Sequence, residues 1–418
     1  MKPWAELTHF VGFDWASDHH DVVVLDRHGQ MAADFSFEDT AAGWASFLKQ
    51  MGPFAAPAVV IETCQGPAVE RLMELGLTVY PINPKNAQRY RERKVSSGAK
   101  SDHLDALSSA DALRTDGHAW RALQLEDPII VELRQLCRDE IGFIEQRTAF
   151  VNQLREGLRQ YYPAALEAFD DWTHESAWAF VEKFPTPQAL LRAGKREWEK
   201  FLHVHKLYRP ETYEKRLACF ARATEFCGSP PTTAAKKLLA VTLCKSLCAL
   251  ELQLKEYRKQ IDALFRRHPD HDLFGSLPGV GDKIGPRLLG EVGTDRGRFD
   301  AADALQCYGG TAPVTYKSGK SRRVYIRRAC NKVLRSTVQF LADHSRSTCA
   351  WAQAYYQKKI EEGKAHNTAL RCLGQRWLKI VWKMWQTRTS YDSELHQRNQ
   401  LAHGSWVLKL LPSVQPAQ

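Results

Sequence analysis

Over the first 125 residues, short apolar runs that indicate strands are separated by stretches of helical spacing. Residues 8–25 predict two strands joined by a short polar turn, and Met31–Phe37 predicts a third. The apolar runs Ala58–Ile61 and Leu77–Ile82 predict two more. Helical spacing occurs at Thr40–Met51, Gly66–Leu75 and about Ser101–Leu113. Strands that alternate with helices after an opening hairpin predict an α/β domain with a mixed central sheet.

Two long helical patterns dominate the middle of the chain. From about Pro128 to Tyr161, and again from about Thr232 to Arg267, apolar residues recur at threes and fours with charged residues between them. The second stripe consists of Leu243, Leu247, Leu250, Leu254, Tyr257, Ile261 and Leu264. Residues 166–235 have no clear repeat and predict a helical insertion. The two long helices could pair as an antiparallel stalk or as a dimerising coiled coil, and the pattern is compatible with both.

From Phe274 onward the pattern is that of a mainly α-helical domain. Leu277–Leu289 has the form of a helix-hairpin-helix turn, in which Gly279 and Gly281 permit a tight bend. Backbone N–H groups of such a turn, with Lys283 beside them, can face a phosphate at a helix N-terminus. A plain Pro-Gly connection between helices is the alternative interpretation.

These patterns divide the chain into four segments. We expect an α/β domain over residues 1–125, a helical stalk over residues 126–270 with its insertion at about 166–235, a mainly α domain over residues 271–400, and a tail over residues 401–418. The Trp-rich helical stretch Ala365–Gln386 is expected to contribute to a core, and Ser413–Gln418 is expected to be frayed.

Composition is that of a folded, soluble protein. The 418 residues (47.6 kDa) are 44% hydrophobic and 25% charged, which excludes a disordered chain, a collagen-like fibre and a simple coiled coil. The apolar run Ala55–Ile61 is far shorter than the roughly 18 residues of a membrane span, so we expect a cytoplasmic protein without a membrane partner. Ten scattered Cys without zinc-finger spacing are interpreted as reduced thiols.

Basic residues are in excess and are concentrated in two places. The 58 Lys and Arg against 48 Asp and Glu give a formal net charge of +10. No Asp or Glu occurs between Ala304 and Ala342, where a Ser-Gly turn is surrounded by Lys317, Lys320, Arg322, Arg323, Arg327, Arg328, Lys332 and Arg335. The second concentration consists of Lys85, Arg89, Arg91, Arg93, Lys94 and Lys100. Two such clusters, each beside a candidate site, favour binding of a polyanion.

Four carboxylates in the first domain follow the pattern of a metal site. Two end apolar strands, and two lie three residues apart on one face of a predicted helix; they are Asp14, Glu62, Asp102 and Asp105. Such a set can bind one or two hard divalent cations such as Mg²⁺ through oxygen ligands. Asp18 and Asp21 are left out because they fall in or after the predicted turn.

Ser318 is the candidate nucleophile of the third segment. It lies in the basic turn Tyr316–Arg323, whose cations could hold a scissile phosphate and stabilise the negative charge of its transition state. A serine hydroxyl needs activation by a base, a metal or a cationic setting. On the residues alone, a serine in such a turn is more often a phosphate contact than a nucleophile.

The motifs also occur in an order that is typical of one family. They are Val11–Asp14, Val60–Thr63, Lys100–Ala106, Ser276–Gly281 followed by Arg298-Phe299, Tyr308–Pro313 and Tyr316–Lys320. In this combination the chain resembles the transposases of the insertion-sequence 110 family, to which the Piv DNA invertases are related. The resemblance covers about residues 8–165 and 235–350, and the segment 166–235 is longer than the family leads us to expect.

The resemblance implies an N-terminal RuvC-like domain of ribonuclease-H type, in which Asp14, Glu62, Asp102 and Asp105 bind Mg²⁺ or Mn²⁺. It also implies a C-terminal transposase domain, in which Ser318 attacks a DNA phosphodiester and forms a covalent phosphoserine. Strands would be exchanged through a Holliday-type junction, while a structured bridge RNA pairs with donor and target DNA. All five positions carry the family's residue types.

Pairing to a guide RNA would leave the protein to contact nucleic-acid backbones, which agrees with the lack of a zinc-finger or homeodomain pattern. The residues selected for this role are Lys317, Lys320, Arg322, Arg323, Arg327, Arg328, Gly279, Gly281, Lys283, Arg91, Arg93 and Lys94.

Two enzymatic functions stay open. One is a recombinase that joins Ser318 chemistry to the acidic site, and the other is a metal-dependent Holliday-junction nuclease in which water attacks and Ser318 only binds phosphate. An inactive nucleic-acid-binding regulator is disfavoured by the complete set of five residues. The two sites lie more than 200 residues apart in sequence, so they must meet by folding back or across subunits. We expect a dimer or tetramer associated with a bacterial or archaeal nucleoid.

Overall fold

The computed structural model describes residues 4–64, 66–94 and 101–407, and the chain divides into two units, Met1–Leu125 and Glu126–Gln418. Lys100 of the second basic cluster and the predicted tail Ser413–Gln418 lie outside the described residues. The first unit holds 12 Lys and Arg against 16 Asp and Glu, which gives it a net charge of −4. Since the whole chain has a net charge of +10, the second unit has a net charge of +14. None of the helices in the described ranges has the length and apolar character that a membrane crossing requires.

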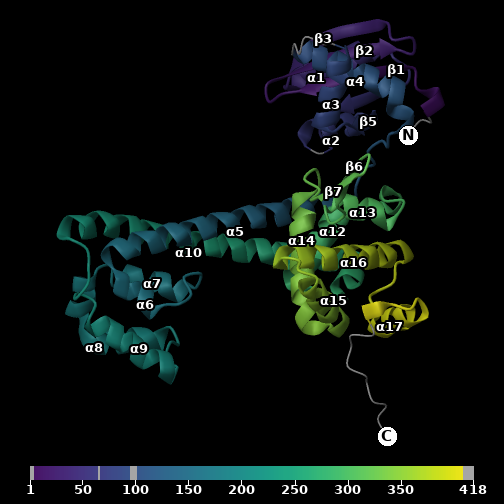
Figure 1. Cartoon of the computed structure of the whole chain (residues 1–418). Coiled ribbons are helices and arrows are strands. Elements are labelled where there is room, and N and C mark those ends of the chain that lie inside the picture. Colours follow the sequence, from purple (N-terminus) through teal and green to yellow (C-terminus); the bar gives the residue numbers. More distant parts are fainter. Residues whose placement is uncertain (1–3, 65, 95–100, 408–418) are drawn as a thin grey trace. The chain divides into compact units, whose positions relative to one another are not determined.

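The first unit is organised around a five-stranded sheet with the order β3-β2-β1-β4-β5 (Figure 1). β1 (His9–Trp15), β2 (His19–Asp26) and β3 (Met31–Glu38) pair antiparallel, whereas β4 (Pro57–Ile61) and β5 (Thr78–Pro81) continue from β1 in parallel. The predicted mixed sheet is confirmed. Its helices are α1 (Ala41–Met51), α2 (Pro67–Glu74), α3 (Pro84–Lys94) and α4 (Asp102–Asp116), with short 3₁₀ turns at Trp4–Glu6 and Gly117–Ala119.

Alternate residues of β1 face two different helical layers. Val11 and Phe13 pack in a core with α1 and α2, whereas Phe10 packs in a core with α3 and α4. Gly12 shares the second face, and there α4 lies directly on the strand: a Cβ at Gly12 would be 1.8 Å from the carbonyl oxygen of Ala106. The strand and the helix therefore meet backbone to backbone.

Helix α3 differs from the sequence-based expectation, which assigns no element to this basic stretch. Ala87 is its only buried residue, so the helix has no apolar stripe that a periodicity argument could detect. Pro84 is its first residue, a position at which the missing N–H is not needed for a helical hydrogen bond.

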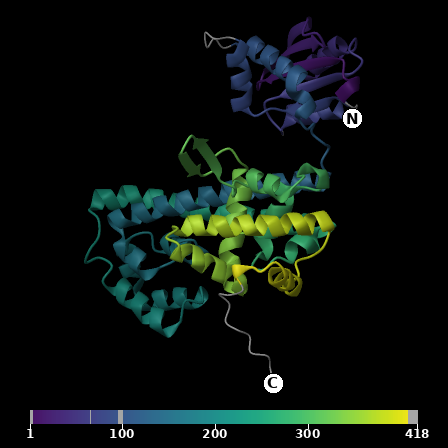
Figure 2. The same ribbon diagram turned by 45° about the vertical axis from the view of Figure 1, so that its right-hand side comes forward.

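In the second unit, α5 (Pro128–Tyr161) and α10 (Pro230–Arg267) lie side by side over most of their lengths (Figures 1 and 2). Ion pairs join Glu140 to Arg258 at 3.3 Å and Arg147 to Glu251 at 2.8 Å. Residue numbers rise in one helix as they fall in the other, so the helices are antiparallel within one chain. Of the two pairings left open by the sequence, the structure has the antiparallel stalk.

The segment between the two long helices is helical, as predicted, and has a core of its own. It contains α6 (Pro163–Ala168), α7 (Glu175–Lys183), α8 (Pro187–Val204) and α9 (Pro210–Ala221). The rings of Phe180 and Phe220 stack with centroids 4.9 Å apart, and Trp178 is fully buried. Leu154 and Leu243 of the long helices belong to the same core, which attaches the insertion to the stalk.

The rest of the second unit is mainly helical and includes one small hairpin. Its elements are α11 (His271–Gly275), α12 (Gly281–Val292), a 3₁₀ turn at Arg296–Arg298, α13 (Ala302–Tyr308), β6 (Val314–Ser318), β7 (Ser321–Tyr325), α14 (Lys332–Thr348), α15 (Ala350–Glu361), α16 (His366–Thr387) and α17 (Ser393–Ala402). Trp377 and Trp385 of α16 are fully buried, which confirms that the Trp-rich stretch forms core. The basic Ser-Gly turn is the tip of the β6–β7 hairpin.

The contact at Gly12 gives a stability prediction. We expect Gly12→Ala to destabilise the first unit by about 3 kcal/mol or more, because the new methyl group would overlap the backbone of α4. Gly142→Ala in α5 is the matched control: a Cβ there meets nothing within 4 Å, so the helix should gain roughly 0.5–1 kcal/mol. Thermal unfolding of the full-length variants measures both. Equal unfolding midpoints for Gly12→Ala and the wild type would contradict this packing of α4 on β1.

Candidate active site

Two of the predicted acids leave the sheet of the first unit at the same edge. Asp14 is the sixth residue of β1, and the parallel register sets Phe13 opposite Ile61, the last residue of β4. Glu62 follows at once, so it emerges beside Asp14. Its negative charge is close enough to contribute to raising the pKa of Asp14.

The other two acids come from the first turn of α4. The Ser101 side chain caps this helix by accepting a hydrogen bond from the N–H of Leu104 at 3.2 Å. Asp102 and Asp105 therefore lie one turn apart at the helix start, above the face of the sheet on which Gly12 allows α4 to pack. One carboxylate oxygen each from Asp14, Asp102 and Asp105 lie within 4.8 Å of one another.

The electrostatics of this acidic cluster fit a bound cation. Burial, and then the negative charges of Asp105, Asp102 and Glu62, raise the pKa of Asp14 to about 6. Asp105 is only 9% exposed, so water screens its charge weakly. Carboxylate oxygens are the ligands that hard divalent cations prefer. The cluster is therefore compatible with a divalent metal ion.

Asp21, which the sequence-based set leaves out, lies at this cluster. It is directly opposite Asp14 in the β1–β2 register, and its charge also raises the pKa of Asp14. With His19 and Asp102 it forms a second group of potential ligand atoms within 4.8 Å. Asp21 falls after the turn, as expected, but it is already the third residue of β2, which begins at His19. The sequence could have predicted this pairing by symmetry, because residues equidistant from the centre of a hairpin turn face each other.

A basic side chain from α3 occupies the edge of the acidic cluster. Arg91 donates a hydrogen bond to Asp105 and forms an ion pair with it, which raises the pKa of the guanidinium. Lys94 pairs with Asp111 of α4 at 3.0 Å, whereas Arg93 is exposed. Of the three basic residues of α3 that were predicted to contact nucleic acid, Arg91 and Lys94 thus already have carboxylate partners on α4.

Ser318 lies in the second unit, as the last residue of β6 and opposite Ser321. Gly319 has a φ of +55°, typical of a type II′ turn with glycine at its first central position. Ser318 is exposed, and so are the four surrounding cations: Lys317, Lys320, Arg322 and Arg323. The hairpin therefore presents a serine hydroxyl on a surface that has cations and no acidic residue.

The base of the hairpin holds two further predicted contacts. The Nε of Arg327 donates a hydrogen bond to the carbonyl oxygen of Ala312 at 3.3 Å. Arg328 is exposed. Arg327 thus helps to fix the base of the hairpin, and Arg328 leaves its charge free to meet a ligand.

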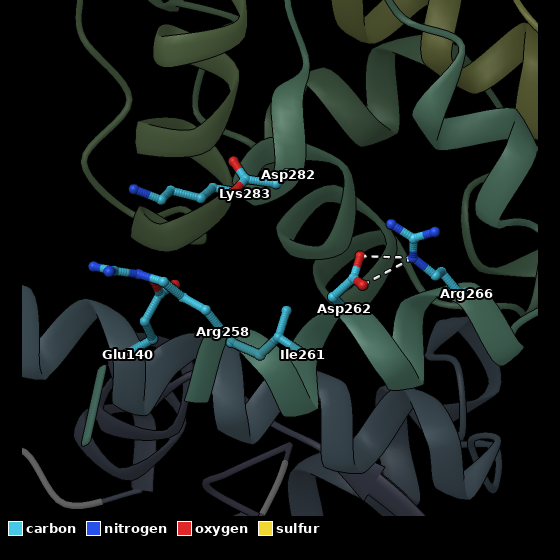
Figure 3. Close-up of a pocket in the computed structure, with 7 residues that line it drawn as sticks. All are labelled: Glu140, Arg258, Ile261, Asp262, Arg266, Asp282 and Lys283. Carbon is cyan, nitrogen blue, oxygen red and sulfur yellow. Dashed lines mark hydrogen bonds and ion pairs between the residues drawn. The ribbon is translucent and has the colours of Figure 1, made fainter. Parts of the chain in front are cut away.

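The predicted helical hairpin joins α11 to α12 through a turn with Gly279 at φ +75° and Gly281 at φ +55°. Lys283 follows in the first turn of α12, on the wall of a cavity of about 260 Å³ between α12 and the stalk (Figure 3). Three carboxylates and three cations line this cavity together with Ile261; they are Glu140, Asp262, Asp282, Arg258, Arg266 and Lys283. Because these charges balance, the cavity does not by itself indicate an anion site.

Comparison with known proteins matches two ranges of the chain to transposase families. A family model described as a transposase matches residues 11–163, and a model of the IS116/IS110/IS902 transposase family matches residues 271–357. The mini-circle transposase assigned to IS117 of Streptomyces coelicolor is 34% identical over 93% of this chain and 96% of its own. The chain belongs to the IS110 family of transposases.

Two further relatives show how widely the similarity extends. The 43.6 kDa protein of insertion element IS110 from Streptomyces coelicolor is 30% identical over 73% of this chain and 75% of its own. The 44.8 kDa protein of IS116 from Streptomyces clavuligerus is 26% identical over 90% of this chain and 94% of its own. As an IS110-family transposase, the protein binds DNA and acts in its cleavage and rejoining. The two matched ranges contain the acidic cluster and the hairpin, and helices α7 to α9 lie outside both.

The raised pKa of Asp14 predicts a pH-dependent effect on stability. Above pH 6 the folded transposase must ionise a carboxyl group that its surroundings favour as neutral, so Asp14→Asn should stabilise metal-free protein by roughly 1 kcal/mol after allowance for solvent screening. The gain should fade as the pH falls from 6 towards 4 and vanish below the unfolded-state pKa of 3.8, where the wild-type group is protonated in both folded and unfolded chains. Thermal unfolding in chelator across this range measures it.

Asp26→Asn is the control of opposite sign. Its carboxylate accepts hydrogen bonds from the N–H groups of His28 and Gln30, both at 2.8 Å, and these bonds lower its pKa. Its loss should therefore lower the unfolding midpoint at neutral pH. Destabilisation by Asp14→Asn in chelator would contradict the described acidic cluster.

Proposed function

We propose that this IS110-family transposase cuts and exchanges DNA strands with Ser318 as nucleophile and the acidic cluster as the site of a divalent metal ion. The observation that carries the proposal is the exposed hydroxyl of Ser318 at the tip of a hairpin with four cations and no acid. The family membership supports it, because DNA transposition requires both strand cleavage and rejoining.

In the proposed first step, the Ser318 oxygen attacks the phosphorus of a DNA phosphodiester. The new serine–phosphate bond forms as the bond to a deoxyribose oxygen breaks, and that oxygen leaves as a hydroxyl group after gaining a proton. Arg323, on the same face of the hairpin as Ser318, and Lys320 in the turn would stabilise the negative charge that develops on the phosphate. In the reverse step, a hydroxyl group of another strand attacks the phosphoserine, which joins the two strands and frees the serine.

The acidic cluster supplies what the hairpin lacks. No carboxylate occurs between Ala304 and Ala342, so a proton acceptor and a metal site must come from elsewhere in the same chain or in another copy. We propose Asp14, Glu62, Asp102 and Asp105 as the ligand set, with Asp21 beside it. Bound Mg²⁺ or Mn²⁺ would polarise the phosphate oxygens.

The acidic cluster also supports one alternative. Its carboxylates are brought together within the first unit without any contribution from Ser318. A nuclease in which water attacks a Holliday junction would therefore need only this unit's chemistry. The two functions leave different products: a phosphoserine adduct or a free cleaved end.

A pair of serine variants separates these functions. We expect full-length protein incubated with Mg²⁺ and its element-end DNA to form a covalent protein–DNA band that survives denaturant, and Ser318→Ala to abolish that band. Ser321→Ala, at the position opposite on the same hairpin, should retain it. Asp105→Asn should reduce cleavage by at least about a hundredfold if the metal site acts on the same phosphate. Cleavage that is equally strong in Ser318→Ala, without an adduct, would establish the nuclease instead.

Guidance by a structured RNA is the second element of the proposal. The net charge of +14 on the second unit supports binding of more than one nucleic-acid strand. We expect purified transposase to carry RNA and adduct formation on duplex DNA to be lost after ribonuclease treatment and restored by adding the RNA back. Undiminished adduct formation after complete RNA removal would contradict RNA guidance and leave the Ser318 chemistry standing.

A further inference from the structure

The two faces of the β6–β7 hairpin differ in chemistry. Side chains alternate between the faces of a strand, and the register assigns each residue to one of them. The aromatic face consists of Val314, Tyr316, Ser318, Ser321, Arg323 and Tyr325, and the opposite face of Thr315, Lys317, Arg322 and Val324. The proposed nucleophile therefore shares its face with two tyrosines.

Both tyrosine side chains are exposed to solvent. Tyr316 is 64% exposed and Tyr325 is 48% exposed, and their rings meet edge to face with centroids 5.4 Å apart. A two-stranded hairpin of this length is marginally stable by itself and has no core in which to bury such rings. Exposed aromatic surface on an element of this kind is characteristic of a binding surface.

The charges of the hairpin restrict the class of ligand. Arg323 lies on the aromatic face and Lys320 in the turn next to Ser318. Lys317 and Arg322 lie on the opposite face, and no acidic residue occurs on either strand. Aromatic rings among cations are the chemistry of single-stranded nucleic-acid binding, in which bases stack on the rings and the cations follow the backbone. Because a surface without carboxylates repels basic partners, a polyanion with flat, apolar bases is the complementary ligand.

We propose that the aromatic face binds an unpaired base of the DNA strand that Ser318 attacks, with Tyr316 as a positioning residue. This inference rests on the proposed function and adds a subsite to it. Two residues along a strand advance about 7 Å, the length of about two stacked nucleotides. The base on Tyr316 therefore belongs within about two nucleotides of the scissile phosphate, and the transposase engages its DNA with that base out of the duplex.

The test uses full-length protein in chelator and a short single-stranded DNA with one 2-aminopurine, whose fluorescence reports stacking. Tyr316→Ile removes the ring but keeps a strong strand former, Tyr316→Phe keeps the ring, and Val324→Thr changes the opposite face. We expect Tyr316→Ile to weaken binding by about tenfold to a hundredfold and to abolish the fluorescence change. Tyr316→Phe and Val324→Thr should match the wild type.

A second DNA separates loss of stacking from loss of the hairpin fold. With an abasic residue in place of the 2-aminopurine, binding by the wild type should fall to the level of Tyr316→Ile, and binding by that variant should not fall further. Equal losses for both proteins on the abasic DNA would overturn the proposal, because the base and the ring would then act independently.

Other outcomes assign the aromatic face to a different ligand. A wild-type response in Tyr316→Ile would overturn the proposal, and so would a response seen only with an RNA of the same sequence. If Tyr316→Ile changed the sedimentation of the protein without changing its DNA binding, the proposal would be overturned in favour of a protein partner. The covalent-adduct assay distinguishes failure of this proposal from failure of the proposed function. An adduct without base stacking would contradict only the Tyr316 subsite, and base stacking without an adduct would contradict only the role of Ser318 as nucleophile.

Discussion

The close approach of α4 to β1 at Gly12 is the contact on which the acidic cluster depends. Any side chain at this position would overlap the carbonyl of Ala106, so the helix can lie on the strand only because glycine is there. That approach carries Asp102 and Asp105 to within 4.8 Å of Asp14. The fold thus offsets carboxylate repulsion with backbone packing, and burial together with that repulsion raises the pKa of Asp14.

The hairpin of the second unit has the opposite charge and the opposite exposure. The acidic cluster gathers partly buried anions that favour a cation, whereas β6 and β7 expose cations and tyrosines that favour an anion with flat bases. The two units divide charge in the same way, −4 against +14. A phosphodiester can use both kinds of site, since its oxygens can bind a metal ion while its added negative charge is neutralised by Lys and Arg.

Within the second unit, buried ion pairs hold the stalk to the helix that follows it. Glu140 is 2% exposed and accepts hydrogen bonds from Arg258 of α10 and Arg287 of α12, so one buried carboxylate joins three helices. Removing one partner of such a buried ion pair would leave an uncompensated charge, which makes the pairing specific in register. The same three helices carry the cavity wall that includes Lys283.

The sequence by itself determined the type and order of most elements, including the two long helices, because apolar period and local spacing are properties of neighbouring residues. The roles of the four acids and of Ser318 stay predictions. The sequence-based prediction missed α3, whose single buried residue leaves no stripe, and it left out Asp21. Only the tertiary structure decided that Asp21 faces Asp14, that Arg91 pairs with Asp105, that α5 and α10 are antiparallel and that Tyr325 shares a face with Ser318. Each of these depends on strand register or helix pairing, which bring together residues that no local pattern relates.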